Sequence, residues 1–191
     1  MTEKMQKPFG LWDSPITALS VSQGIRLNDV QWDSDGSSLV WLEGRSGNGI
    51  LVAKPWETAG YDLNGEISCR GGVGYGGGEF TIRGKKVIFA GKDGRLYQRT
   101  LHPEKPKAIT PAYGSVASPK ISPDGEFVLF VFSDGKDDLI GVVDVDGKKW
   151  PQKLIEGADF YNQPTWHPSG DWIAWIEWNH PNMPWDGTRL K

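Results

Sequence analysis

Ser118-Pro-Lys-Ile-Ser-Pro-Asp-Gly-Glu-Phe-Val-Leu-Phe-Val-Phe132 is the stretch that decides the fold. A short half-polar segment runs into Pro123-Asp124-Gly125, where proline presets φ and glycine tolerates a positive φ, so the chain turns tightly. The run from Phe127 to Phe132 does not alternate polar with apolar residues. Such a strand must be covered on both faces, which a lone hairpin cannot provide. The stretch therefore predicts strand, turn and strand inside a larger assembly.

The same unit occurs three more times. Its marker glycines are Gly36, Gly84, Gly125 and Gly170, spaced by 48, 41 and 45 residues, and an apolar run follows each one. A period near 45 residues with several short strands is typical of a propeller blade, because a four-stranded blade buries its faces only against its neighbours. An ordinary β-sandwich with similar turns is the alternative. We predict an all-β fold, a partial β-propeller of about three and a half four-stranded antiparallel blades.

The expected organisation is a flexible leader over residues 1–10 and the N-terminal part of a propeller over residues 11–191. Blades are expected near 27–64, 72–111, 114–157 and 158–191, the last one incomplete. Residues 11–26 precede the first blade and are interpreted as an orphan strand that needs a partner. Asn48-Gly49 is interpreted as a hairpin turn of the first blade, like the six Asp-Gly pairs of the chain.

A chain that stops partway round a ring reads as the front half of a longer protein. We expect such a piece to leave apolar blade faces exposed at both ends. These faces should drive self-association or the borrowing of strands.

Composition argues against several classes of partner. The 191 residues include 21 basic and 24 acidic side chains, for a net charge of −3, and the basic residues are scattered. Nucleic acid and anionic membranes are therefore poor candidates. No apolar run approaches a membrane span, and the first residues contain no apolar core of a secretion signal. Cys69 is the one cysteine, which excludes an internal disulfide and favours a cytoplasmic location.

Gly72-Val-Gly-Tyr-Gly-Gly77 satisfies the Gly-x-Gly-x-x-Gly pattern of dinucleotide sites. That site needs a helix N-terminus after the glycines, whereas the residues that follow, 79–82, read as a strand. The alternative is the start of a blade, where backbone crowds the central tunnel and side chains do not fit. We expect no bound cofactor.

Metal sites are equally weak in the sequence. Asp33-x-Asp35-Gly36 and Asp144-x-Asp146-Gly147 resemble the start of a calcium loop but lack a third acid and the distant bidentate glutamate, so they are interpreted as turns. His102, His167 and His180 lack the spacing of metal ligands. The sequence predicts no metal-binding residue.

The chain has ten tryptophans, which raises the possibility of a sugar-binding propeller. Four of them could stack on sugar rings: Trp172, Trp175, Trp178 and Trp185. The alternative assigns the first three to the blade core by strand alternation and leaves Trp185 as a contact for a partner.

No Gly-x-Ser-x-Gly occurs, so no nucleophile elbow is present and the chain is expected to hold no catalytic residue.

Four strings together resemble the N-terminal propeller of prolyl oligopeptidase family serine peptidases, closest to the acylaminoacyl-peptidase and dipeptidyl-aminopeptidase branch. They are residues 12–18 (Trp-Asp-Ser-Pro-Ile-Thr-Ala), 75–78 (Tyr-Gly-Gly-Gly), 122–125 (Ser-Pro-Asp-Gly) and 180–188 (His-Pro-Asn-Met-Pro-Trp-Asp-Gly-Thr). The resemblance covers roughly residues 9–191. TolB-type propellers share the repeats, whereas the first and last strings are more specific. Val73 and Gly74 stand where the family commonly has His-Glu, which puts a role of that glutamate toward a substrate amino group in doubt.

The resemblance implies a downstream α/β-hydrolase domain with Ser, Asp and His in that order, capped by the propeller so that only short peptides enter. This chain would then be a non-catalytic gate and scaffold, with that hydrolase domain as its partner and a peptide as the substrate of the parent. A TolB-type interaction propeller without an enzyme is the alternative from another class. A glycan-binding propeller is the third.

Overall fold

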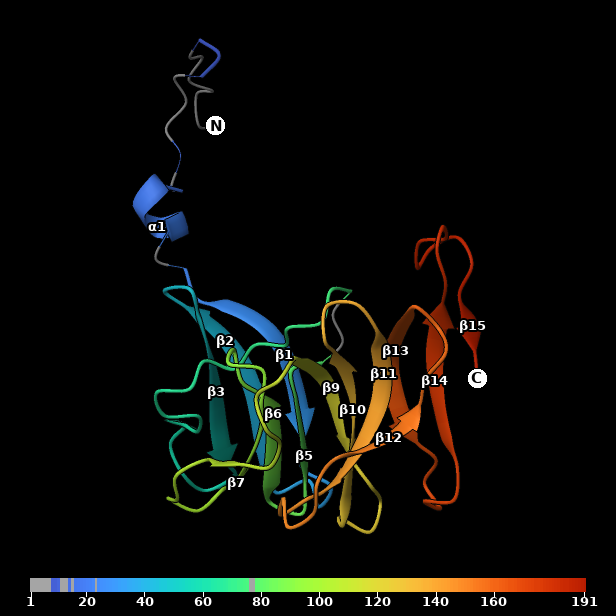
Figure 1. The fold of residues 1–191 in the computed structure, drawn as a ribbon. Helices are drawn as coiled ribbons and strands as arrows, with labels where there is room; N and C mark the ends of the chain where they lie inside the picture. Colours follow the sequence, from blue (N-terminus) through green and yellow to red (C-terminus); the bar gives the residue numbers. More distant parts are fainter. Residues whose placement is uncertain (1–7, 11–13, 15, 23, 76–77) are drawn as a thin grey trace.

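A computed structural model describes residues 8–10, 14, 16–22, 24–75 and 78–191 (Figure 1). The described strands form four small antiparallel sheets, each following the chain order of its strands. The predicted all-β partial propeller is therefore confirmed. The sheets comprise β1 (Arg26–Trp32), β2 (Ser38–Arg45), β3 (Asn48–Pro55) and β4 (Tyr61–Asp62); β5 (Phe80–Arg83), β6 (Lys86–Ala90), β7 (Leu96–Thr100) and β8 (Lys107–Ala108); β9 (Ser115–Ile121), β10 (Phe127–Ser133), β11 (Asp138–Asp144) and β12 (Gln152–Ile155); and β13 (Phe160–Trp166), β14 (Ile173–Trp178) and β15 (Arg189–Leu190).

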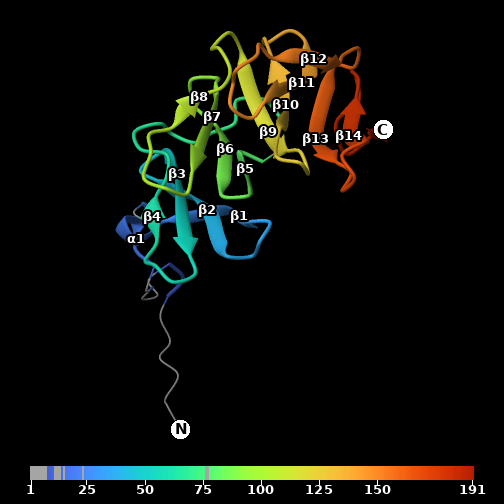
Figure 2. The same cartoon turned by 90° about the horizontal axis from the view of Figure 1, so that it is seen from below.

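The four sheets follow one another along an arc (Figure 2). The first strand of each sheet, namely β1, β5, β9 and β13, lies on the concave side of this arc, and neighbouring first strands are in contact. Each of these four strands pairs within its sheet on one side only. Their free edges therefore face the axis around which the sheets are arranged, as the inner strands of a propeller do.

The core is divided into layers between neighbouring sheets. Strand β10 shows the reason most clearly, because Val128 and Phe130 pack toward the second sheet while Leu129 and Val131 pack toward the fourth. All four side chains are at most 3% exposed. The unbroken apolar run of the sequence thus corresponds to a strand that is buried on both faces.

Tight turns close the lower face, at the bottom of Figure 1. The four marker glycines, Gly36, Gly84, Gly125 and Gly170, all have positive φ, between 55° and 83°. Hydrogen bonds also join neighbouring turns, since Asp33 Oδ2 accepts from the N–H of Lys85 at 2.8 Å. The repeated turn residues therefore both reverse the chain and fasten one sheet to the next.

The orphan strand predicted over residues 11–26 is wrong for residues 14, 16–22 and 24–26, whereas residues 11–13, 15 and 23 lie outside the described residues. The described residues of this segment contain α1 (Ala18–Ser22), in which Val21 N–H donates to the carbonyl of Thr17 at 3.1 Å, and only Arg26 is in a strand. Among the described residues no strand pairs with residues 16–22. Residues 1–7 of the predicted leader lie outside the described residues.

The predicted Asn48-Gly49 turn is also wrong. The turn is Ser46-Gly47, with both φ angles positive, and Asn48 and Gly49 already belong to β3. Gly49 is required for a different reason, because a Cβ there would lie 1.9 Å from the carbonyl oxygen of Cys69.

No helix among the described residues is long and apolar enough to cross a membrane.

Candidate functional site

A cavity of about 830 Å³ opens on the concave side of the arc and is lined by all four sheets. Its lining is mainly polar. The residues come from β1, β9, β13 and the two residues before β5: Asn28, Asp29, Gln31, Trp32, Gly78, Glu79, Ser118, Lys120, Gln163 and Thr165. Because these are the inner strands, the cavity is the described part of the central channel of the propeller.

Bulges shape the channel wall. The pairing of β9 with β10 shifts register around Ser118-Pro119, and the pairing of β13 with β14 shifts around Gln163-Pro164. Ser118 and Gln163 have φ of 52° and 49°, a left-handed conformation that is uncommon for residues other than glycine. Proline has no N–H to lose from the ladder, so both prolines fit a bulged strand with one free edge.

Three hydrogen bonds fix the inner strands to one another. Gln31 Nε2 donates to the carbonyl of Phe80 at 2.9 Å, which joins β1 to β5. The N–H of Ser118 donates to the carbonyl of Gly78 at 2.7 Å, and Trp166 Nε1 donates to the carbonyl of Lys120 at 3.0 Å. Each junction between neighbouring sheets therefore has one such bond at the channel wall, which holds the wall in a defined shape.

The channel wall carries charge that is partly shielded from water. Burial and the neighbouring Asp29 carboxylate raise the pKa of Glu79, while Arg70 and the N–H of Gly71 act in the opposite direction. Burial, followed by Glu79 and Asp29, raises the pKa of the Cys69 thiol well above its usual value. Ser118 is fully buried and its Oγ has no hydrogen-bond partner. The wall can thus offer carboxylate acceptors to a polar chain that passes along it, whereas the Ser118 hydroxyl is buried behind the surface.

A segment that we name the strap, residues 69–75, crosses the upper face and touches all four sheets. Cys69 N–H donates to the carbonyl of Gly49 in the first sheet at 2.9 Å, and Arg70 N–H to the carbonyl of Ala90 in the second at 2.8 Å. Gly72 N–H donates to the carbonyl of Val116 in the third at 3.0 Å. The strap then leads to Tyr75, which packs against the fourth sheet.

Tyr75 ends the strap in an aromatic cluster. Its ring meets Phe160 and Trp178 edge to face, with centroids 5.4 and 5.3 Å apart, and Phe160 stacks on Trp178 at 5.1 Å. The Tyr75 hydroxyl donates to Met183 Sδ at 3.5 Å. His180 packs edge to face on Phe160 at 4.8 Å. Two strings that are about 100 residues apart in the sequence therefore meet on one face.

Hydrogen bonds within the loop and to Asp159 hold the loop between β14 and β15, which we name the 179–187 loop. His180 N–H donates to Asp159 Oδ2 at 2.8 Å, and Asn179 Oδ1 accepts from Asp159 N–H at 2.8 Å. Met183 N–H donates to Asp186 Oδ2 at 3.2 Å. Trp185, 75% exposed, projects from this ordered loop. A large exposed ring on an ordered loop is typical of a contact surface.

The glycine-rich pattern does not form a nucleotide site. The strand β5 follows it rather than a helix, and its first glycine lies in the strap close to β9, since a Cβ on Gly72 would lie 2.9 Å from Ser115 Cβ. A Cβ on Gly71 would lie 3.3 Å from Ala117 Cβ. The interpretation as crowded backbone therefore fits Gly72 but not Gly74, which has open space where a Cβ would lie. Gly76 and Gly77 lie outside the described residues.

The Asp-x-Asp-Gly strings form turns. The Asp144 carboxylate accepts from the N–H groups of Lys148 and Lys149 at 2.9 and 2.6 Å, while Asp146 pairs with Lys148 at 2.8 Å. His102, His167 and His180 are exposed. Among the residues described, no three histidine, cysteine, aspartate or glutamate side chains gather in a way that could hold a metal ion.

The four tryptophans proposed for sugar stacking do not share a surface. Trp178 is 2% exposed, and Trp175 packs into the core beside the third sheet. Trp172 and Trp185 are about 75% exposed, but one precedes β14 and the other follows it, so they lie toward opposite faces. A single stacking platform is therefore excluded for this set.

Reasoning from the sequence did not single out the channel residues Asp29, Gln31, Glu79, Lys120 and Gln163. The sequence does contain a pattern that could have indicated these residues, namely Ser118-Pro119 and Gln163-Pro164 inside predicted inner strands. Proline within a strand marks a free edge or a bulge. Both dipeptides lie on the channel wall.

No protein-family model matches the sequence, and no curated protein matches it. Solved structures do match. A puromycin-hydrolysing peptidase of Mycobacterium tuberculosis is similar with 31% identity and a TM-score of 0.82, over 98% of this chain and 32% of that one. A puromycin hydrolase solved in complex with PGG is similar with 26% identity and a TM-score of 0.78, over 96% of this chain and 32% of that one. The chain thus spans about a third of the length of these peptidases.

TolB propellers match the fold. The proteins from Acinetobacter baumannii and Agrobacterium tumefaciens are 16% and 18% identical, each with a TM-score of 0.65 over 86% of this chain and over 40% and 64% of their own chains. The predicted resemblance to peptidase propellers of the prolyl oligopeptidase family with TolB-type repeats is confirmed by these matches. Residues 12, 13, 15, 76 and 77 of the strings that carried it lie outside the described residues.

Proposed function

We propose that this chain is the non-catalytic propeller segment of a serine peptidase, which caps an α/β-hydrolase domain of the same protein and limits which peptides reach it. The observation that carries the proposal is the similarity to two peptidases over nearly the whole of this chain, at 31% and 26% identity. The chain accounts for only about a third of those proteins, which leaves room in a homologous parent for a separate catalytic domain.

The channel supports a role in access. Its wall is polar and offers acceptors from Asp29, Glu79 and Gln163 beside the amine of Lys120. A peptide in extended conformation exposes backbone N–H and C=O groups that need such partners when water is removed. The polar lining of the channel therefore fits an extended peptide.

The upper face supports a contact with a neighbouring domain. The strap, the aromatic cluster and the 179–187 loop together present the exposed Trp185 from a hydrogen-bonded framework. Contact surfaces favour large rings whose position is already fixed, because little conformational entropy is then lost on docking. We assign this face to the hydrolase domain of the parent.

The coding sequence beyond Lys191 provides the first test. Further blades followed by Gly-x-Ser-x-Gly support the proposal, whereas a stop after the ring supports a TolB-type interaction propeller. Hydrolysis of peptide nitroanilides by the 191-residue chain alone would contradict its assignment as non-catalytic.

Kinetics of the whole protein test the access role. Thr165→Trp places a large ring on the channel wall, and Thr58→Trp makes the same change at an exposed position outside it. We expect Thr165→Trp to lower kcat/KM for pentapeptide substrates by roughly tenfold, about 1.4 kcal/mol in barrier, and to affect dipeptide nitroanilides much less. Equal effects of the two substitutions, or equal effects on both substrate lengths, would contradict the role of the channel.

A further inference from the structure

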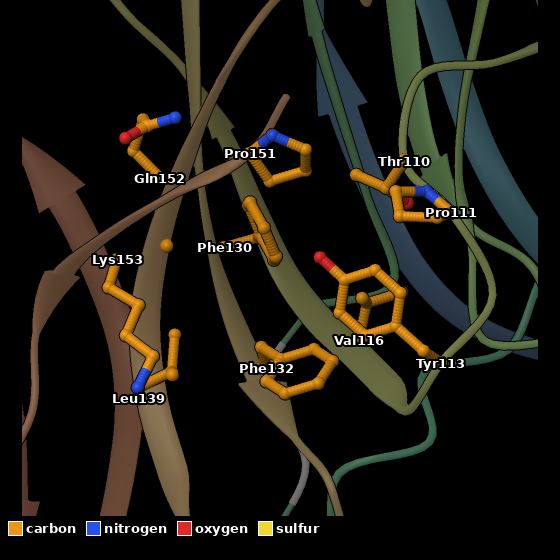
Figure 3. Close-up of a pocket in the computed structure, with 11 residues that line it drawn as sticks. Thr110, Pro111, Tyr113, Val116, Phe130, Phe132, Leu139, Pro151, Gln152 and Lys153 are labelled. Carbon is orange, nitrogen blue, oxygen red and sulfur yellow. The ribbon is translucent and has the colours of Figure 1, made fainter. Parts of the chain in front are cut away.

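A second concave site lies on the outer side of the molecule, between the second and third sheets (Figure 3). It is a small apolar hollow of about 90 Å³. Phe130, Phe132 and Val116 form its floor, the segment 110–113 forms one wall, and the segment 151–153 forms the other. The hollow is distinct from the channel, since the two share no lining residue.

The hollow exists because one residue of β11 lacks a side chain. Gly141 pairs with Phe130 on one side and with Lys153 on the other. A Cβ at Gly141 would lie 2.7 Å from Phe130 Cζ, so any larger residue would displace the ring that forms the floor. Tyr113 packs edge to face on Phe132, with centroids 5.5 Å apart, and is still 58% exposed. The result is an apolar hollow bordered by an accessible aromatic ring.

The hollow continues into a second one. They share Thr110, Pro111 and Pro151, and the second, of about 340 Å³, extends to Trp150. Trp150 is 70% exposed. The two hollows therefore form an elongated groove from Tyr113 to Trp150, which we name the outer groove. An elongated groove with an aromatic ring at each end suits an extended segment rather than a compact ligand.

Charge indicates what such a segment carries. Every charged residue that lines the outer groove is a lysine, namely Lys148, Lys149 and Lys153, although the chain as a whole has a net charge of −3. Lys148 and Lys153 pair with Asp146 and Glu156, and these exposed pairs are weak enough to be exchanged for a partner's carboxylates. The lining is thus electrostatically complementary to acidic residues.

We propose that the outer groove binds an extended acidic peptide segment of a partner protein, with one small apolar side chain seated in the hollow over Phe130. The apolar side chain supplies affinity by leaving water, and Tyr113 and Trp150 cover the peptide backbone on either side. The lysines select acidic flanks and speed association. This surface is separate from the channel and does not depend on the proposed peptidase role.

Fluorescence anisotropy with designed probes tests the proposal. The probe is a fluorescein-labelled peptide, Glu-Asp-Glu-Leu-Asp-Glu, compared with the same peptide carrying Ser in place of Leu. We expect the 191-residue chain to bind the leucine probe at least about tenfold more tightly than the serine probe, and more weakly at 0.5 M salt. The double variant Lys149→Glu with Lys153→Glu and the variant Tyr113→Ala should each weaken binding of the leucine probe by about tenfold or more.

Lys92→Glu with Lys136→Glu is the matched control, because it makes the same change in charge at exposed turns outside the groove. The control should bind the leucine probe within about twofold of the unmodified chain. Equal affinity for the leucine and serine probes, or an equal loss in the control, means that only non-specific charge attraction is present and overturns the proposal. Absence of binding at low salt also overturns it. So does self-association that is abolished by Tyr113→Ala, since the occupant is then a second copy of this chain.

Discussion

Replacement of Tyr75 by alanine tests whether the strap holds the 179–187 loop in place. The substitution removes two edge-to-face ring pairs, to Phe160 and Trp178, and the hydroxyl contact with Met183. Each ring pair contributes about 0.5–1.5 kcal/mol, so we expect a loss of roughly 1–3 kcal/mol. The loss should be local, because Tyr75 is 40% exposed and lies at the end of the strap rather than in a core layer.

Native-state hydrogen exchange measures this loss directly. The amides of Asn182 and Asp186 donate within the loop, to the carbonyls of Asn179 and Met183 at 3.0 and 2.9 Å. In the Tyr75→Ala protein they should exchange roughly 5- to 150-fold faster, while the amides of β6 keep their protection. Tyr75→Phe keeps both ring pairs and is expected to change the loop amides by less than about threefold. Unchanged loop exchange in Tyr75→Ala would refute the idea that the strap orders the loop.

Three further predictions concern stability, each measured by urea unfolding. Asp33→Asn puts an NH2 group, which cannot accept a hydrogen bond, where Asp33 Oδ2 accepts from Lys85 N–H, and we expect the free energy of unfolding to fall by about 1–3 kcal/mol. An unchanged free energy of unfolding would show that the bond between these turns is dispensable. Burial raises the pKa of Glu79 in the folded protein above the ordinary value near 4.5 that it has in the unfolded chain. The folded state is therefore destabilised as the pH rises from about 4.5 through the folded-state pKa, because the buried carboxyl group must lose its proton. Glu79→Gln should therefore be more stable than the unmodified chain at pH 7, with the advantage vanishing below about pH 4.5, and an advantage that persists at pH 3 would contradict this cause. Gly49→Ala places a Cβ 1.9 Å from the carbonyl oxygen of Cys69 and should cost at least about 1–3 kcal/mol, whereas an equally stable protein would mean that the strap can move away from β3 at no cost.

Much of the fold could be predicted from the sequence because the propeller repeats a local rule. The unbroken apolar run of β10 required two covered faces, and the structure buries Val128 and Leu129 on opposite ones. The marker glycines required a positive φ, which they have. These are short-range properties, so a single strand and its turn contain the information.

The errors arose where the outcome depends on a distant neighbour. Asn48-Gly49 has the composition of a hairpin turn, but the turn is two residues earlier, at Ser46-Gly47, and Gly49 instead packs against the backbone of Cys69. Similarly, residues 16–22 had the apolar content of a strand, yet among the described residues no strand lies beside them. A short segment without a strand edge to pair with can still form hydrogen bonds within a helical turn, as the N–H of Val21 does with the carbonyl of Thr17.

The channel illustrates why a site can be less visible in the sequence than the fold that builds it. Its residues are not clustered in the sequence, because each of the four repeats contributes only two to four of them, and none carries a catalytic motif. They share a position: the strand edge that has no partner within its sheet. Proline is tolerated at such an edge because no ladder bond is lost there, and Pro119 and Pro164 both follow a residue with positive φ on the channel wall. A proline inside the first strand of a propeller repeat therefore indicates which edge is free, and the polar residues beside it are the ones exposed to whatever passes along the axis.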